Sequence, residues 1–115
     1  MGVDKSLVTR STTLLLLKLL EQEDMYGYQM IEELHQRSDH TFSLKAGTLY
    51  PLLHDLQKQG MISVYEKTAE TGRMRKYYRL TKPGRAALAE KEMEWQTFSL
   101  AVNKVLMGGA RFAAI

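Results

Sequence analysis

The hydrophobic pattern of this chain changes period at Gly60, and this change constrains the fold more than any other feature. Before Gly60, four leucines recur at the i, i+3, i+4 and i+7 positions of a helix with one buried face: Leu49, Leu52, Leu53 and Leu56. After it, residues 62–65 alternate apolar and polar side chains, which is typical of a β-strand. Because a glycine commonly terminates a helix, we expect a helix that ends near Gly60 and a strand that follows at once.

A second strand is predicted at residues 75–80. Its alternation divides the side chains between two faces, with Tyr78 and Leu80 on one face and Arg75, Tyr77 and Arg79 on the other. Residues 69–73 include Gly72 and are typical of a turn. Two alternating segments joined by a glycine-containing loop predict a β-hairpin.

Two further helices are predicted upstream of residue 40. The first covers residues 9–21, with Thr9 or Ser11 as N-cap, and its leucines surround almost the whole circumference: Leu14, Leu15, Leu16, Leu17, Leu19 and Leu20. A helix that is apolar all round must be buried on more than one side. The second covers residues 26–37, and residues 38–43 form the turn before the leucine-patterned helix.

Three helices followed by a hairpin indicate a winged helix-turn-helix, mainly α with a small β-hairpin. We assign residues 1–80 to this winged helix DNA-binding domain. Residues 81–107 are predicted as a C-terminal dimerisation helix, and residues 108–115 as a flexible tail.

The predicted last helix is too long for so small a domain to cover. Thr81 is a suitable N-cap, Pro83 falls in the first turn, and the helix would span roughly 40 Å. Its apolar residues form two nearly opposite stripes, one of Leu88, Trp95, Phe98, Val102 and Val105 and one of Ala86, Met93, Leu100 and Met107. One stripe can pack on its own domain and the other then requires a second chain, so we expect a homodimer. The dimerisation residues would be Leu15, Leu88, Trp95, Phe98, Val102 and Val105. The alternative is a helix that folds back over a larger monomer core.

Positive charge gathers in the middle of the chain. Residues 41–80 contain seven Lys or Arg and three Asp or Glu, whereas residues 1–40 contain four Lys or Arg and seven Asp or Glu. A basic patch favours a polyanionic partner, although charged residues often only solvate a surface. The outer face of the leucine-patterned helix adds small, hydrogen-bonding and cationic side chains, as a helix in the major groove of double-stranded DNA requires. The predicted DNA-binding residues are Lys45, Thr48, Tyr50, His54, Lys58, Arg73, Arg75 and Lys76.

The position of Pro51 leaves two starts open for this recognition helix. If the helix begins near Lys45, Pro51 removes the backbone hydrogen bond to Gly47. If it begins at Tyr50, Pro51 lies in the first turn, where it costs nothing. We favour the earlier start.

Two motifs resemble the PadR-like family of bacterial transcriptional regulators. The first is Ala46-Gly47-Thr48-Leu49-Tyr50-Pro51-Leu52-Leu53, and the second is Gly72-Arg73-Met74-Arg75-Lys76-Tyr77-Tyr78-Arg79-Leu80-Thr81. Shorter matches lie at 26–28, 59–62 and 84–85. The resemblance as a whole covers about residues 9–107. It implies a homodimeric winged helix repressor of the short type, with one C-terminal helix, that contacts operator DNA through the start of its recognition helix and its wing.

The same resemblance implies a second kind of ligand. Some short members of the family bind flat, apolar compounds between aromatic residues of the two subunits, and Trp95 and Phe98 match such a role. The alternative is that Trp95 only packs against the protein core.

Other function classes receive little support. The three histidines show no H-E-x-x-H spacing and the chain contains no cysteine, so we expect neither an enzyme nor a metal or cofactor site. No apolar run approaches the length of a membrane span, and no signal peptide is recognisable, so we expect a cytoplasmic protein. The remaining alternative is a winged helix module that contacts another protein and not DNA.

Overall fold

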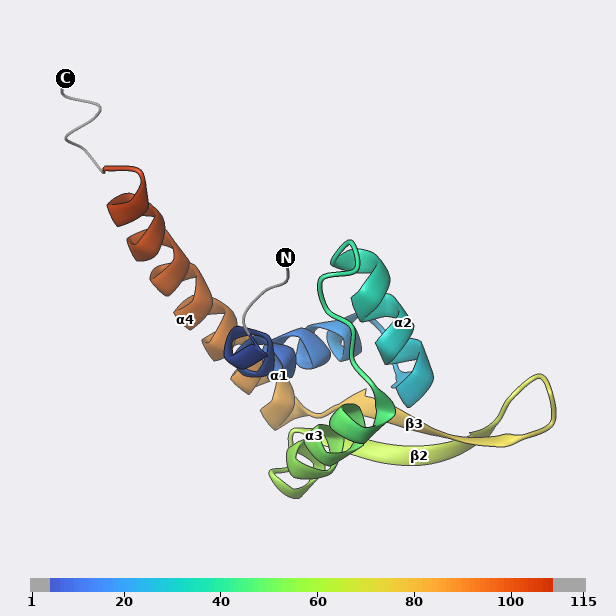
Figure 1. Cartoon of the computed structure of the whole chain (residues 1–115). Coiled ribbons are helices and arrows are strands. Elements are labelled where there is room, and N and C mark those ends of the chain that lie inside the picture. Colours follow the sequence, from blue (N-terminus) through green and yellow to red (C-terminus); the bar gives the residue numbers. More distant parts are fainter. Residues whose placement is uncertain (1–4, 109–115) are drawn as a thin grey trace.

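A computed structural model describes residues 5–108 of the chain as a small helical domain with one projecting helix (Figure 1). The elements in chain order are α1 (Lys5–Gln22), β1 (Met25–Tyr26), α2 (Gly27–Arg37), α3 (Ala46–Lys58), β2 (Ile62–Thr68), β3 (Met74–Leu80) and α4 (Lys82–Leu106). The predicted fold class is confirmed. Of the tail predicted at 108–115, residues 109–115 lie outside the described residues.

The leucine-covered helix α1 lies at the centre of the domain. Figure 1 shows it between α4 on one side and α2 on the other, and it also contacts β3. Four of its leucines are buried, namely Leu16, Leu17, Leu19 and Leu20. The predicted burial on more than one side is therefore confirmed, and each such leucine contributes roughly 1.5–3 kcal/mol relative to an exposed one.

Helix α3 begins at the earlier of its two predicted starts. Lys45 is the N-cap, and its carbonyl oxygen accepts from the backbone N–H groups of Thr48 at 3.0 Å and Leu49 at 2.9 Å. Pro51 therefore lies inside the helix, four residues after Gly47. The helix ends as predicted: Gly60 adopts a φ of +77°, which glycine tolerates best, and the Met61 N–H closes the turn on the Leu56 carbonyl at 3.0 Å.

The three strands form one antiparallel sheet in the order β1-β3-β2. The predicted hairpin is confirmed: Ile62 pairs with Leu80 and Thr68 with Met74, so both strands are slightly longer than expected. At the turn, the Ala69 N–H donates to the Arg73 carbonyl at 2.7 Å. The third strand, β1, was not predicted, because two residues are too few for any periodicity.

Helix α4 begins where the sequence indicates. The Thr81 hydroxyl accepts from the Gly84 N–H at 3.1 Å and donates to the Gly60 carbonyl at 2.6 Å, so the cap also ties α4 to the end of α3. The first turns of α4 lie beside α1, and the rest extends away from the domain (Figure 1). Among residues 5–108, no helix is both long enough and apolar enough to cross a membrane.

One predicted dimerisation residue is misassigned. Leu88 is fully buried within its own chain, where it belongs to the core formed with α1 and the sheet. A side chain without exposed surface offers nothing to a second subunit, so Leu88 is a core residue. The stripe to which it was assigned divides along the helix. Its first residue packs inward, whereas the residues further along the helix are exposed in the single chain, namely Trp95, Phe98, Val102 and Val105.

Candidate nucleic-acid interface

The outer face of α3 is open to solvent along its whole length. Leu49, Leu53 and Leu56 are buried on its inner face. All five DNA-binding residues predicted on or beside this helix are exposed: Lys45, Thr48, Tyr50, His54 and Lys58. The amphipathic pattern therefore leaves these hydrogen-bonding side chains free to meet a ligand that lies along the helix.

A polar cleft of about 590 Å³ separates α3 from the wing. It is lined by the start of α2, by Tyr50 and by the wing, namely Tyr26, Gly27, Tyr28, Glu32, Tyr50, Arg73, Met74, Arg75 and Lys76. The cleft thus brings together four of the eight predicted DNA-binding residues. The other four lie elsewhere along α3: Lys45, Thr48, His54 and Lys58.

Arg75, in the middle of the three wing arginines, is held by an aromatic side chain. The guanidinium carbon of Arg75 lies 4.3 Å from the centre of the Tyr26 ring. Tyr26 in turn packs edge-on against Tyr77, with 5.5 Å between the ring centres. A cation over an aromatic face is attracted by about 0.5–2 kcal/mol, so the Arg75 side chain is partly ordered within the chain itself.

The base of the wing is fixed to the loop after α1. The Tyr65 hydroxyl donates to the Asp24 carboxylate at 2.7 Å, and the Arg79 Nε donates to the same oxygen at 3.1 Å. The hydrogen bond to Asp24 raises the pKa of Tyr65 above its ordinary value of 10.0, with smaller contributions from burial. Arg79 is therefore occupied by an internal ion pair, in contrast to Arg73 and Lys76 nearer the tip.

A second, mostly apolar cleft of about 310 Å³ lies between α1 and α4. Its lining consists of Leu7, Ser11, Leu14, Leu15, Lys18, Phe42, Glu92, Trp95 and Gln96. Trp95 is one of these lining residues. Phe98 is not, but its ring centre lies 6.3 Å from that of Trp95, and the two rings share a neighbouring shallow pocket.

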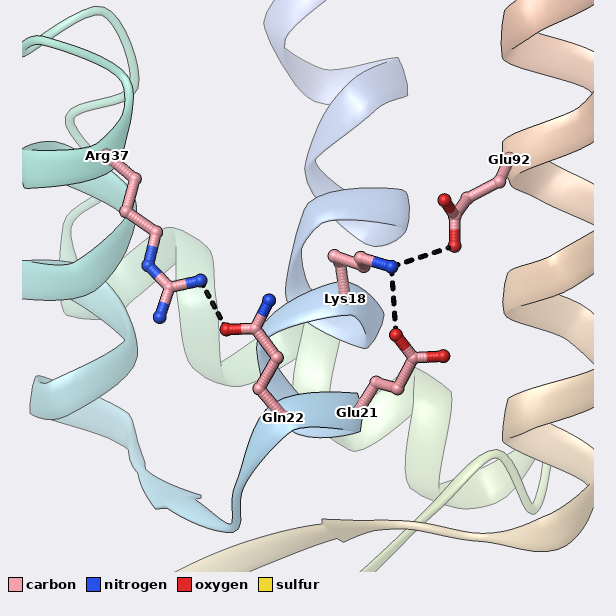
Figure 2. A network of polar contacts seen from close by, with 5 residues as sticks. All are labelled: Lys18, Glu21, Gln22, Arg37 and Glu92. Atoms are coloured by element: carbon pink, nitrogen blue, oxygen red, sulfur yellow. Dashed lines mark hydrogen bonds and ion pairs between the residues drawn. The ribbon is translucent and has the colours of Figure 1, made fainter.

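An ion pair at this cleft connects the two helices. In Figure 2 the Lys18 ammonium points between Glu21 at 2.9 Å and Glu92 of α4 at 3.3 Å. The hydrogen bond to Glu21, followed in size by the one to Glu92, raises the pKa of Lys18 above its ordinary value of 10.5. On the other side of α1, Arg37 of α2 donates to the Gln22 side-chain oxygen at 2.5 Å. Of these contacts, the one between Lys18 and Glu92 helps to fix the position of α4 on α1.

Five residues that line the polar cleft were not among the predicted DNA-binding residues: Tyr26, Gly27, Tyr28, Glu32 and Met74. Tyr26, Gly27 and Tyr28 bring the start of α2 next to Tyr50 and the wing. Tyr28 is 62% exposed. The unusual Tyr-Gly-Tyr run was the only available signal. Within residues 5–108, no three His, Cys, Asp or Glu side chains gather closely enough to hold a metal ion.

A helix-turn-helix whose second helix is exposed beside a basic hairpin defines the winged helix class of DNA-binding proteins. The chain belongs to the Transcriptional regulator PadR-like family, whose sequence model matches residues 16–90. Members of this family are transcriptional regulators and not enzymes.

Three relatives support the assignment. A padr family transcriptional regulator of Eggerthella lenta has 34% sequence identity and a TM-score of 0.75, with 88% of this chain and 86% of that chain covered. Uncharacterized protein X of Lysinibacillus sphaericus is 37% identical over 81 residues, 70% of this chain and 74% of that protein. Transcriptional regulator Rv3488 of Mycobacterium tuberculosis is 42% identical over 67 residues, 58% of this chain but only 59% of that protein.

Proposed function

We propose that this chain is a sequence-specific DNA-binding repressor that acts in the cytoplasm as a homodimer. The observation that carries the proposal is the arrangement of α3 and the wing, because an exposed recognition face and a cluster of cations lie on either side of one polar cleft. Residues 41–80, which build this surface, have four more Lys and Arg than Asp and Glu. Such a surface suits the phosphate backbone and the groove edges of DNA.

The two elements take different parts in binding. Thr48 and Tyr50 lie in the first half of α3, where a helix in the major groove approaches base edges most closely. Arg73, Arg75 and Lys76 contact the backbone or the adjacent minor groove, where cations are favoured. Lys45 and Lys58, near the two ends of α3, bind phosphates, and His54 bonds a base or a phosphate.

A gel-shift titration with the region upstream of the chain's own gene tests this proposal. We expect a specific complex that an excess of unrelated duplex does not displace. When purified RNA polymerase transcribes from a promoter in this upstream region, the protein should lower the transcript yield, as a repressor does. The absence of any complex would favour the other candidate, a winged helix module for protein contact. A complex without loss of transcript would leave a DNA-binding regulator that is not a repressor.

The homodimer is supported by the apolar surface of the projecting part of α4. Phe98 is 61% exposed and Val105 80% exposed in the single chain. Leu15, Trp95 and Val102 complete the proposed dimerisation surface. Exposed apolar surface of this kind commonly marks a protein–protein interface. Two subunits would place their α3 helices in half-sites about one helical turn, roughly 34 Å, apart.

A small aromatic effector is a further part of the proposal. The cleft between α1 and α4 is largely apolar, and Trp95 offers a face for stacking. Trp95 is the single tryptophan, so all the tryptophan fluorescence of the chain comes from this position. We expect quenching by some members of a panel of flat aromatic compounds, with weaker binding in Phe98→Ala and unchanged binding in Met93→Ala. Fluorescence that none of the panel alters would contradict the effector site.

A further inference from the structure

The phenol of Tyr50 lies directly against the backbone of Gly27, at the floor of the polar cleft. A Cβ atom added at Gly27 would be 3.0 Å from Cε1 of the Tyr50 ring and 2.7 Å from Cζ, and closer still to the phenol oxygen. Carbon atoms that are not bonded pack at about 3.5–4.0 Å. No residue with a side chain fits at position 27 while Tyr50 keeps this position.

We propose that Gly27 is a positioning residue for DNA recognition, which acts by holding the Tyr50 side chain against α2. Tyr50 stands on α3, and Gly27 is the first residue of α2, so the contact joins the two helices of the helix-turn-helix. It sets the direction in which a half-exposed phenol meets the DNA. The inference rests on the proposed function, because it assigns Tyr50 to reading the operator.

The surroundings of Gly27 indicate that a side chain at this position would disturb DNA recognition and leave the fold intact. The three atoms nearest to such a Cβ all belong to the outer end of the Tyr50 side chain. Because this side chain is 46% exposed, it can swing towards solvent. A different glycine illustrates the opposite case: at Gly84 a Cβ would meet the backbone carbonyl of Met61, which cannot swing away. Gly27→Ala should therefore move Tyr50 and preserve the fold, since alanine also favours a helix more than glycine does.

The experiment compares two labelled duplexes of equal length, one selected by this protein from a random-sequence library and one with the same bases scrambled. The readout is the ratio of the two dissociation constants at a fixed salt concentration. A misplaced base-reading side chain reduces discrimination by about 5- to 100-fold. We expect Gly27→Ala to lower the ratio by such a factor, while its affinity for the scrambled duplex and its melting temperature stay as in the wild type.

A double-mutant cycle identifies Tyr50 as the residue through which Gly27 acts. In a Tyr50→Ala background, Gly27→Ala should cause no further loss of discrimination. If Gly27→Ala alone lowers the melting temperature, Tyr50→Ala should restore it, because the crowded ring is then gone.

Three results would overturn the inference. The first is an unchanged ratio of the two dissociation constants in Gly27→Ala. The second is a fall of this ratio on Gly27→Ala that is equally large in the wild-type and the Tyr50→Ala backgrounds. The third is a lowered melting temperature that Tyr50→Ala fails to restore. A wild-type ratio near one would overturn the proposed function, and the inference with it, whereas a large wild-type ratio that Gly27→Ala leaves intact overturns the inference alone.

Discussion

Leu88→Ala tests whether α4 is anchored in its own domain before it reaches a partner. Leu88 has no exposed surface in the single chain and belongs to the core cluster with α1 and the sheet. Truncation of a buried leucine to alanine removes its transfer free energy and leaves a cavity, at a cost of about 2–5 kcal/mol. A loss of about 3 kcal/mol would raise the unfolded-to-folded ratio about 100-fold and lower the melting temperature by about 10–20 °C.

The assay is urea unfolding followed by circular dichroism at two widely separated protein concentrations. Because Leu88 lies within one chain, the destabilisation should be the same at both. Val105→Ala is the matched control, since Val105 lies on the same helix but is 80% exposed. Its effect should appear only at the concentration at which dimers form. The reasoning is refuted if Leu88→Ala weakens association and leaves the stability of the isolated chain unchanged.

Three other variants test separate parts of the account. Arg75→Ala should weaken binding to all duplexes alike and reduce the slope of log affinity against log salt by about 1; a changed sequence preference would contradict a backbone role. Val105→Asp should give monomers in sedimentation, because a carboxylate is costly in an apolar interface; persistent dimers would place the interface elsewhere. Tyr65→Phe should lower the free energy of unfolding at neutral pH, and the difference from wild type should shrink as the pH rises past 10. The raised pKa of Tyr65 means that its bond to Asp24 stabilises the folded chain below its ordinary pKa of 10.0 and is lost as the pH passes through the raised value. A difference that stays constant with pH would contradict this role.

Local signals predicted the ends of α3 and the start of α4, whereas the predicted start of the first helix was wrong, since α1 begins at Lys5 and Thr9 and Ser11 lie inside it. The leucine spacing placed the buried face of α3, Gly60 its end and Thr81 the start of α4, because each depends on residues within one or two turns. The alternation of Tyr78 and Leu80 with the arginines of β3 likewise predicted which side faces the core.

The features that could not be predicted from the sequence depend on the tertiary arrangement of the helices and the sheet. The burial of Leu88 depends on where α4 meets α1, which no periodicity within α4 encodes. The polar cleft joins α2, Tyr50 and the wing, and these segments are far apart in the chain. For the same reason the residues at 26–28 matched the family but received no predicted role.

The central claim is that α3 and the basic wing bind DNA, and the salt dependence of affinity tests it most directly. The measurement is the fluorescence anisotropy of a labelled duplex from the chain's own upstream region, titrated with protein between about 50 and 200 mM salt. With six to ten phosphate contacts in a dimer, affinity should fall by about 10³–10⁵ over this range. An affinity that stays flat with salt, or no binding at all, would contradict the account.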